Sequence, residues 1–353
     1  MSENNGHLPI IGRAWHPSTR EPGPLLPATR LALANWVRPD GLARRELVLG
    51  AAEGEPWEVM TIDSESAEQA WRVIHLLDGK RTLADIAKET RLDLALVSSV
   101  AQDLYHRAVL VQTSGLEVDA LTYYEHLRSL AGIAQQRWGP SSMLRRFWTG
   151  PVSRRLAVGY LLENYHFAAA ASSHQSAAVA SQPTERLKTI LSEHLSFEYW
   201  HHAWLKRGLL AAGLTEADLE QASPLISMQA LINHLRWLGM ADPLSYSACI
   251  GVGEGDPTAL ATVGKFWERF TEHGVLPVEA FGPFRDHDIG DCSDDHDQFG
   301  REPFADAGPL TAADQARIRR RLITFCRLTM AYHRELLDFY GPEQGPTVFS
   351  VED

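Results

Sequence analysis

The sequence is poor in cysteine and lacks both clustered positive charge and long apolar runs. Its three cysteines, Cys249, Cys292 and Cys326, lie far apart in 353 residues and form neither a CxxC pair nor a disulfide framework, so we expect reduced thiols. The formal net charge of -12, without a basic run, argues against a nucleic-acid partner, because phosphate-backbone binding depends on clustered Lys and Arg. No apolar run approaches the ~20 residues of a membrane span, and no signal-peptide pattern occurs near the start. The sequence therefore predicts a soluble cytoplasmic protein without a membrane partner.

Three segments of different composition define the expected domains. Residues 1–40 carry six prolines and little apolar periodicity, which predicts an extended arm. Residues 41–115 alternate short strand and helix patterns, with a winged-helix order of two short helices, a longer helix and a closing strand. Residues 116–345 carry apolar residues at helical spacing, which predicts a bundle of about seven or eight helices. The expected fold class is mainly α, with a small N-terminal α+β winged-helix domain.

More detailed patterns give the expected element bounds. In the winged-helix domain, strands are expected at 47–49, 57–63 and 109–111 and helices at 64–79, 82–87 and 94–105. In the bundle, helices are expected at 121–137, 143–148, 152–173, 184–212, 226–238, 245–253, 257–273 and 311–339.

The winged-helix domain is predicted to bind peptide rather than DNA. The helix expected in the recognition position exposes Asp93, Asp103 and Arg107 without a basic stripe. The stretch from Thr61 to Thr82, with its Leu-Asp-Gly-Lys-Arg-Thr ending, resembles the PqqD-like family, or RiPP recognition element. That resemblance implies a strand edge and third helix that clamp the leader of a precursor peptide as an added strand. A winged helix used only for packing or for forming a homodimer is the alternative.

Carboxylates and imidazoles gather in two helical clusters of the second half. Glu163 and His166 are three residues apart and share a helix face, so both could reach one ion. Glu198 precedes His201 by three residues and His202 by four, so either histidine can face the same way as Glu198. A glutamate in an apolar helix could instead face solvent, and this alternative stays open for Glu163.

A third cluster runs from Asp286 to Asp297 and contains six aspartates. Such a density of like charge is unfavourable in a packed structure without a cation, so the segment is either a solvated acidic loop or a metal-binding segment. His287 and Asp291 have the four-residue spacing of two ligands from one helical turn. Together, the oxygen and nitrogen donors favour two ferrous ions, with manganese as an alternative, inside a helical bundle.

At these residues the chain resembles the heme-oxygenase-like diiron oxidases and oxygenases. The stretches that carry the resemblance are Leu162-Glu163-Asn164-Tyr165-His166-Phe167, Glu198-Tyr199-Trp200-His201, the segment 250–255, and His287-Asp288-Ile289-Gly290-Asp291. In the same order, these four stretches are similar to four features of that family: its first ligand helix, its Glu-x-x-His segment, the place of its bridging glutamate, and the start of its His-x3-Asp-x2-His motif. The resemblance implies the metal ligands and catalytic residues Glu163, Glu198, His201, Glu254, His287 and Asp291, with O2 as cosubstrate.

The last position of that motif departs from the family. It is Asp294 in this chain, and His296 follows two residues later. A π-bulge could rotate His296 inward, since such bulges concentrate at functional sites. Otherwise Asp294 or Asp295 completes the second metal site.

The expected activity is O2-dependent non-haem diiron oxidation of an amino-acid residue in a leader-bearing peptide. N-oxygenation and oxidative carbon–carbon cleavage, as in natural-product biosynthesis, are the reactions that the resemblance implies. Two alternatives stay open: a cofactor-independent oxidase or hydrolase of the PqqC/TenA type, with the histidines as acid and base, and a non-catalytic peptide-binding scaffold. A haem oxygenase is disfavoured, because an axial histidine needs no accompanying carboxylates.

Overall fold

The computed structural model forms two compact units. It describes residues 17–34, 37–43, 46–51, 56–61, 64–137, 142–253, 260–293 and 297–342. The first of the two units, which we call the helical unit, comprises Met1–Thr19, Arg137–Pro303 and Ile323–Asp353. The second, the N-terminal unit, comprises Arg20–Gln136 and Phe304–Leu322.

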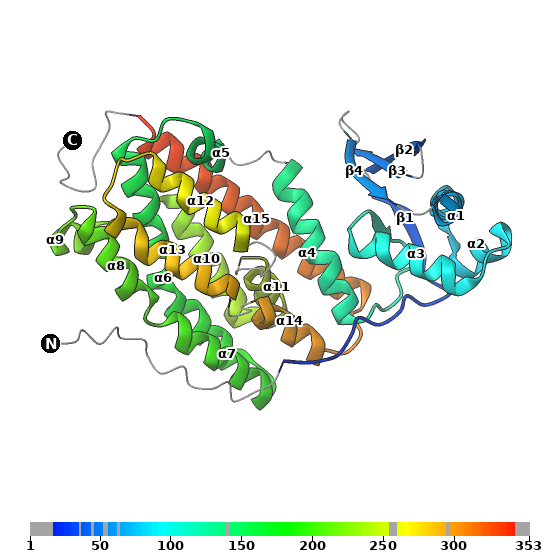
Figure 1. Ribbon diagram of the computed structural model, residues 1–353. Helices are drawn as coiled ribbons and strands as arrows, with labels where there is room; N and C mark the ends of the chain where they lie inside the picture. The colour runs from blue at the N-terminus through cyan, green and yellow to red at the C-terminus, as the bar shows by residue number, and fades with distance from the viewer. Residues whose placement is uncertain are drawn as a thin grey trace. The chain divides into compact units, whose positions relative to one another are not determined.

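The N-terminal unit begins with two small antiparallel sheets and three short helices (Figure 1). One sheet has the order β5 (Asp78–Thr82), β1 (Arg30–Leu33), β6 (Leu110–Gln112). The other has the order β2 (Val37–Ala43), β3 (Glu46–Ala51), β4 (Pro56–Thr61). The helices are α1 (Ser64–Ile74), α2 (Leu83–Thr90) and α3 (Leu94–His106). The predicted winged-helix order of three helices and a closing strand is observed.

Side-chain caps explain where these helices begin and end. Thr82 and Asp85 form a capping box at the start of α2, and Arg91 ends that helix in the left-handed conformation with φ of 60°. Asp93 caps α3 by accepting a hydrogen bond of 2.6 Å from the amide of Ala95. The acidic residue at the start of the expected recognition helix therefore has a structural role.

The predicted proline-rich arm of residues 1–40 is partly wrong. Strand β1 lies inside it and pairs with both β5 and β6, while β2 begins at Val37. The sequence also did not predict strand β5, which occupies the turn between the first two expected helices. Strand pairing joins segments far apart in the chain, so a four-residue strand such as β1 leaves little local signal.

The N-terminal unit extends beyond residue 115, where the sequence placed its boundary. It includes α4 (Ala120–Arg137) except the last residue of that helix, and the beginning of α15 (Ala312–Tyr340). The Tyr123 hydroxyl donates a 2.6 Å hydrogen bond to the Gln315 carbonyl, and the rings of Tyr105 and His126 stack at 4.4 Å. Packing between these residues therefore determines the extent of the N-terminal unit. The boundary expected at residue 115 was based only on a change in sequence composition.

Helices alone build the described part of the helical unit. They are α5 (Ser142–Thr149), α6 (Arg154–Ser181), α7 (Glu185–Glu198), α8 (His201–Ala211), α9 (Glu216–Gln221), α10 (Ile226–Ala241), α11 (Pro243–Gly253), α12 (Leu260–Glu272), α13 (Val278–Ser293), most of α14 (Asp297–Asp306) and the later part of α15. Helix α6 packs against α7, α8 and α10, and α13 packs against α8 and α12. These contacts bring α7, α8 and α13, which carry two of the predicted ligand clusters, to one region.

The expected seven or eight helices are too few, since the described residues alone form twelve, from α4 to α15. The helix predicted at 184–212 is divided at Tyr199 and Trp200, while α9, α13 and α14 had no predicted counterpart. Polar residues hide the periodicity of α13, and Pro283 lies inside that helix. The mainly α fold class is nevertheless confirmed.

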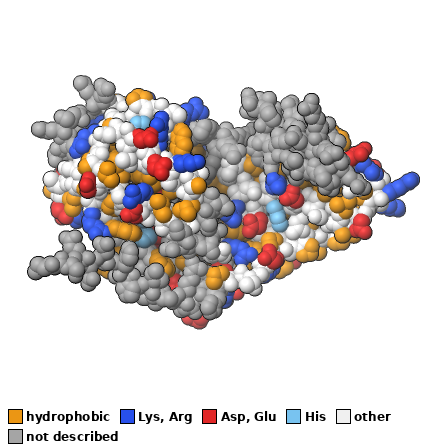
Figure 2. All heavy atoms as spheres, in the orientation of Figure 1, with side chains coloured by type: hydrophobic (Ala, Val, Ile, Leu, Met, Phe, Trp, Pro, Cys, Tyr) orange, Lys and Arg blue, Asp and Glu red, His pale blue; other side chains and the backbone are white. Residues whose placement is uncertain are grey.

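Other properties of the described residues agree with the composition. None of the described helices combines the length and apolar character needed to cross a bilayer. On the face shown in Figure 2, acidic and basic side chains are interspersed among the coloured residues, without an extended basic patch. This mixture gives no support to a phosphate-backbone partner.

Candidate metal centre

The junction between α7 and α8 brings the second predicted cluster together. Helix α7 ends at Glu198 and α8 begins at His201, with Tyr199 and Trp200 between them. Across this junction, His201 Nδ1 lies 2.9 Å from Glu198 Oε2. Glu198 is buried, with 6% of its surface exposed. The three-residue spacing of the sequence thus corresponds to direct contact between the two side chains.

Helix α13 supplies the third cluster. His287 Nδ1 lies 3.2 Å from Asp291 Oδ2, one helical turn away, and 3.2 Å from Asp288 Oδ1. Because α13 packs against α8, the ring of His287 also meets that of His201, with centroids 4.5 Å apart and an angle of 75° between the planes. The acidic segment is therefore helical through Ser293, and His287 faces the α7–α8 junction.

These side chains form two overlapping groups of possible metal ligands. Potential ligand atoms of Glu198, His201 and His287 all lie within 4.8 Å of one another, and the same holds for His287, Asp288 and Asp291. The two groups share His287. We call these five residues the metal-site cluster.

One imidazole nitrogen in this cluster has the environment expected of a metal ligand. His287 Nε2 is buried and has no hydrogen-bond partner among the described residues. Its other ring nitrogen faces the Asp288 and Asp291 carboxylates, and a proton held there leaves the Nε2 lone pair available. A cation would satisfy this atom, and a mixed set of carboxylate oxygens and imidazole nitrogens fits iron or manganese. The residues present therefore fit such an ion.

The electrostatic environment of His287 also favours a cation. Burial by itself lowers the pKa of this imidazole. The Asp291 charge, the hydrogen bond with Asp288 and the Glu198 charge outweigh burial and raise the pKa of His287 to about 10. Three carboxylates thus concentrate negative charge around one partly buried ring, so the site attracts either a proton or a metal ion.

Two nearby residues were not identified as site residues from the sequence. His194 is fully buried, its Nε2 lies 3.8 Å from Glu198 Oε1, and its ring stacks on Phe299 at 4.3 Å. Asp288 accepts a 2.9 Å hydrogen bond from Trp267 Nε1. The four-residue spacing of His194 and Glu198 was a usable signal, whereas the contact of Asp288 with Trp267 depends on packing between α12 and α13.

Glu163, predicted as a ligand, is not part of the metal-site cluster. Both of its carboxylate oxygens accept from the Leu225 amide, at 3.2 and 3.1 Å, and its environment includes Glu335 and Tyr340. Burial raises the pKa of Glu163 to about 8, and the charge of Glu335 adds to this rise, while the Leu225 amide opposes it. This face of α6 meets the beginning of α10 and the later part of α15.

The remaining predicted ligands divide into two sets. His166 and His202 are described by the structure and belong to neither ligand group. Burial lowers the pKa of His166 to about 4. Glu254, Asp294, Asp295 and His296 lie outside the described residues. The predictions that Glu254 bridges two ions and that His296 or an aspartate completes the second site remain predictions.

Comparisons with known proteins identify similar folds. No family model matches the chain, and no curated protein matches it. A domain of unknown function with a heme oxygenase-like fold from Shewanella denitrificans has 14% identity and a TM-score of 0.50, covering 60% of this chain and 89% of that one. A TenA homolog from Pseudomonas syringae pv. tomato has 12% identity and a TM-score of 0.49, covering 62% and 93%. A TenA family transcription regulator from a Silicibacter species has 15% identity and a TM-score of 0.46, covering 61% and 96%.

Identities this low concern the fold alone. The helical arrangement and the likeness to the Shewanella domain agree with the fold class predicted from the sequence. The helices of this chain have a heme-oxygenase-like fold.

Proposed function

We propose that the protein is an O2-dependent non-haem iron oxidoreductase whose metal site is built on Glu198, His201, His287 and Asp291. The observation that carries this proposal is the buried Nε2 of His287, which has no hydrogen-bond partner among the described residues and belongs to an imidazole ringed by carboxylates. Leaving such an atom unsatisfied costs about 1–3 kcal/mol, and a metal ion bound there would remove that cost. Two iron ions, with Glu254 and His296 as further ligands, complete the proposal.

The protein supplies ligands and their orientation. Glu198, His201 and His287 would hold one ion, and Asp291 would contribute to the second. Ferrous iron, when bound by these residues, would supply electrons for the reduction of O2 and so for the oxidation of a substrate held beside it.

Asp288 and Trp267 position His287. Asp288 Oδ2 is fixed by the indole N–H of Trp267, while Oδ1 faces His287 Nδ1 at 3.2 Å. A carboxylate in this position fixes the orientation and tautomer of a metal-binding histidine. Trp267 is itself buried, with 2% of its surface exposed, and packs against Phe270 at 5.4 Å between ring centroids. The arrangement therefore limits rotation of His287.

Anaerobic ferrous titration followed by mixing with O2 tests the proposal. The unmodified protein is expected to bind iron and to consume O2, whereas His287→Ala should lose iron binding and O2 consumption. His202→Ala is the matched control, since His202 belongs to neither ligand group, and it should behave like the unmodified protein. Absence of iron binding in the unmodified protein would overturn the proposal and favour a cofactor-independent enzyme on the same fold.

For the N-terminal unit we propose recognition of an extended peptide that carries the substrate residue. The order of helices and strands is that of a winged helix, and β5 and β6 are the outer strands of its β5–β1–β6 sheet. Outer strands present backbone groups that can pair with an added strand. At the two ends of α3 the charged groups are engaged locally, because Asp103 pairs with Arg107 at 3.1 Å and Asp93 caps the helix.

Selection from a displayed library of extended peptides tests this second proposal. Selected peptides should slow amide hydrogen exchange in β5 or β6 and in α3 of the full chain. Peptides that bind but protect only amides of the helical unit would contradict it. Iron binding is measured separately, so the two proposals can fail independently.

A further inference from the structure

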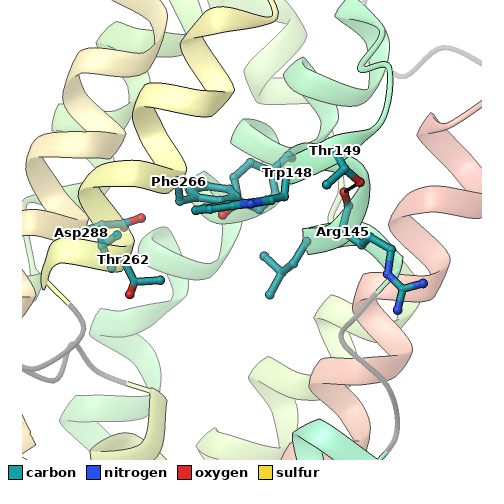
Figure 3. Close-up of a pocket in the computed structure, with 9 residues that line it drawn as sticks. Arg145, Trp148, Thr149, Thr262, Phe266 and Asp288 are labelled. Atoms are coloured by element: carbon teal, nitrogen blue, oxygen red, sulfur yellow. Dashed lines mark hydrogen bonds between the residues drawn. The ribbon is translucent and has the colours of Figure 1, made fainter.

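A pocket of about 510 Å³ lies in the helical unit, lined by residues of α5, α6, α12 and α13 (Figure 3). This volume is in the range of small-molecule sites. Its wall includes Asp288, which also belongs to the metal-site cluster. Since Asp288 Oδ1 is 3.2 Å from His287 Nδ1, an occupant in contact with Asp288 would lie next to the proposed metal site.

Aromatic rings form the middle of this pocket. Figure 3 shows Phe266 and Trp148 between its two ends, and Tyr160 adds a third ring to the wall. The Phe266 ring packs against the buried Trp267 with centroids 5.4 Å apart and against Tyr160 at 6.2 Å, so the wall is preformed. Trp148 remains 39% exposed, and an apolar occupant would remove part of that surface from water. The pocket therefore favours an apolar, ring-sized body.

The two ends of the pocket carry opposite charges. Figure 3 shows Asp288 and Thr262 on one side and Arg145 and Thr149 on the other. Arg145 is exposed, and its guanidinium forms no ion pair with any residue that the structure describes. An unpaired guanidinium is suited to bind a carboxylate through two parallel hydrogen bonds. Asp288, although it accepts from Trp267, has further lone pairs for an ammonium group.

We propose that this pocket is the substrate site and that the substrate is an amphoteric molecule with an apolar ring or chain between an amino group and a carboxylate. The carboxylate pairs with Arg145, the apolar body lies against Trp148 and Phe266, and the amino group lies at Asp288. This assignment rests on the proposed function, because only a metal centre beside Asp288 makes the amino end the reacting end.

A matched series of three probes separates the contribution of each end. The probes are 4-(aminomethyl)benzoate, 4-methylbenzoate, which lacks the amine, and 4-methylbenzylamine, which lacks the carboxylate. Their dissociation constants are measured by calorimetry with metal-free full-length protein. We expect 4-(aminomethyl)benzoate to bind at least about tenfold more tightly than either analogue, since a charge-assisted contact contributes enough free energy for that factor.

Substitution of Arg145 identifies the partner of the carboxylate. Arg145→Gln should weaken both carboxylate probes by about tenfold and leave 4-methylbenzylamine unchanged. Arg146→Gln is the matched control, because Arg146 is an exposed neighbour on the same helix and does not line the pocket. Equal effects of the two substitutions, or equal affinities for all three probes, would overturn the assignment.

The same protein preparations distinguish this proposal from the proposed function. If the protein binds ferrous iron but has equal affinity for the three probes, the pocket assignment alone is overturned. Selective probe binding without ferrous binding overturns the oxidoreductase and leaves an amphoteric ligand site.

The source of the substrate is tested by two peptides that end in 4-(aminomethyl)phenylalanine, one as the free acid and one as the amide. Tighter binding of the acid supports a peptide terminus as occupant. If the small probe binds and neither peptide does, the occupant is a free amino acid.

Discussion

The carboxylate of Glu163 on α6 accepts a hydrogen bond from the backbone amide of Leu225, with Oε2 at 3.1 Å. Leu225 is the N-cap residue of α10 and has no side chain able to cap that helix. Glu335 on α15 accepts from the backbone amide of Ser227, two residues later, at 2.7 Å. Two carboxyl groups from distant helices thus replace the missing cap of α10, which gives Glu163 a structural role.

Replacing Glu163 is therefore expected to destabilise the fold without removing iron. Glu163→Ala should lower the free energy of unfolding by about 1–3 kcal/mol, because it leaves a buried amide without an acceptor. Glu163→Gln retains an acceptor and should cost less at pH 7. Urea unfolding and ferrous titration measure the two properties. Loss of iron at unchanged unfolding midpoint would instead make Glu163 a ligand, as the sequence resemblance implied.

Stability should also depend on pH through Glu163. Its pKa is raised from 4.5 to about 8 in the folded protein, so the unfolded chain loses the proton first as the pH rises. The stabilisation is fully present below pH 4.5 and is lost as the pH rises through 8, with a slope of up to about 1.4 kcal/mol per pH unit. Denaturant midpoints between pH 5 and 9 should fall less steeply in Glu163→Gln. Parallel curves for the two proteins would contradict the prediction.

His126 in the N-terminal unit should produce the opposite dependence. Burial lowers the pKa of His126 from 6.5 to about 4, so the unfolded chain binds the proton first as the pH falls. Stability is therefore retained above pH 6.5 and lost between 6.5 and 4. His126→Gln keeps a donor for the Tyr105 carbonyl, which lies 2.7 Å from His126 Nδ1, and should reduce the acid slope. Thermal unfolding followed at several pH values checks this, and an unchanged slope would count against it.

Adding one methyl group where α6 packs against α15 should lower the stability of the fold. A Cβ at Gly159 would overlap the Tyr340 ring, which is itself buried and lies beside Glu163. Gly159→Ala should therefore lower the free energy of unfolding by about 1–3 kcal/mol, since close-packed interiors tolerate added atoms poorly. Gly264→Ala is the control, because a Cβ there meets nothing within 4 Å and should be neutral or stabilising by about 0.5–1 kcal/mol. Equal stabilities for the two variants would show that this contact can relax.

Helical periodicity predicted the fold class and much of the bundle, because long amphipathic helices leave a local signal. Spacing also predicted that His287 and Asp291 face each other, since residues four apart in a helix share a face. The break at Tyr199 and Trp200 was not predictable, because neither glycine nor proline marks it. That break shapes the junction at which His201 meets Glu198.

The difference between the expected and the observed surroundings of Glu163 has another physical origin. A buried glutamate in an apolar helix has the same local pattern whether it binds a metal ion or caps another helix. Which of these two roles the glutamate has depends on the element that packs against its face of the helix, here the start of α10. That contact joins residues 62 positions apart, so the local sequence does not reveal it. Asp288 was missed for a similar reason, because its partner Trp267 belongs to another helix.

Anomalous X-ray diffraction at the iron edge, from crystals of the full chain soaked anaerobically with ferrous iron, tests the central claim most directly. We predict a peak within coordination distance of Glu198, His201 and His287, lost in His287→Ala crystals and retained in His202→Ala crystals. A peak beside Glu163, or no peak near His287, would contradict the account.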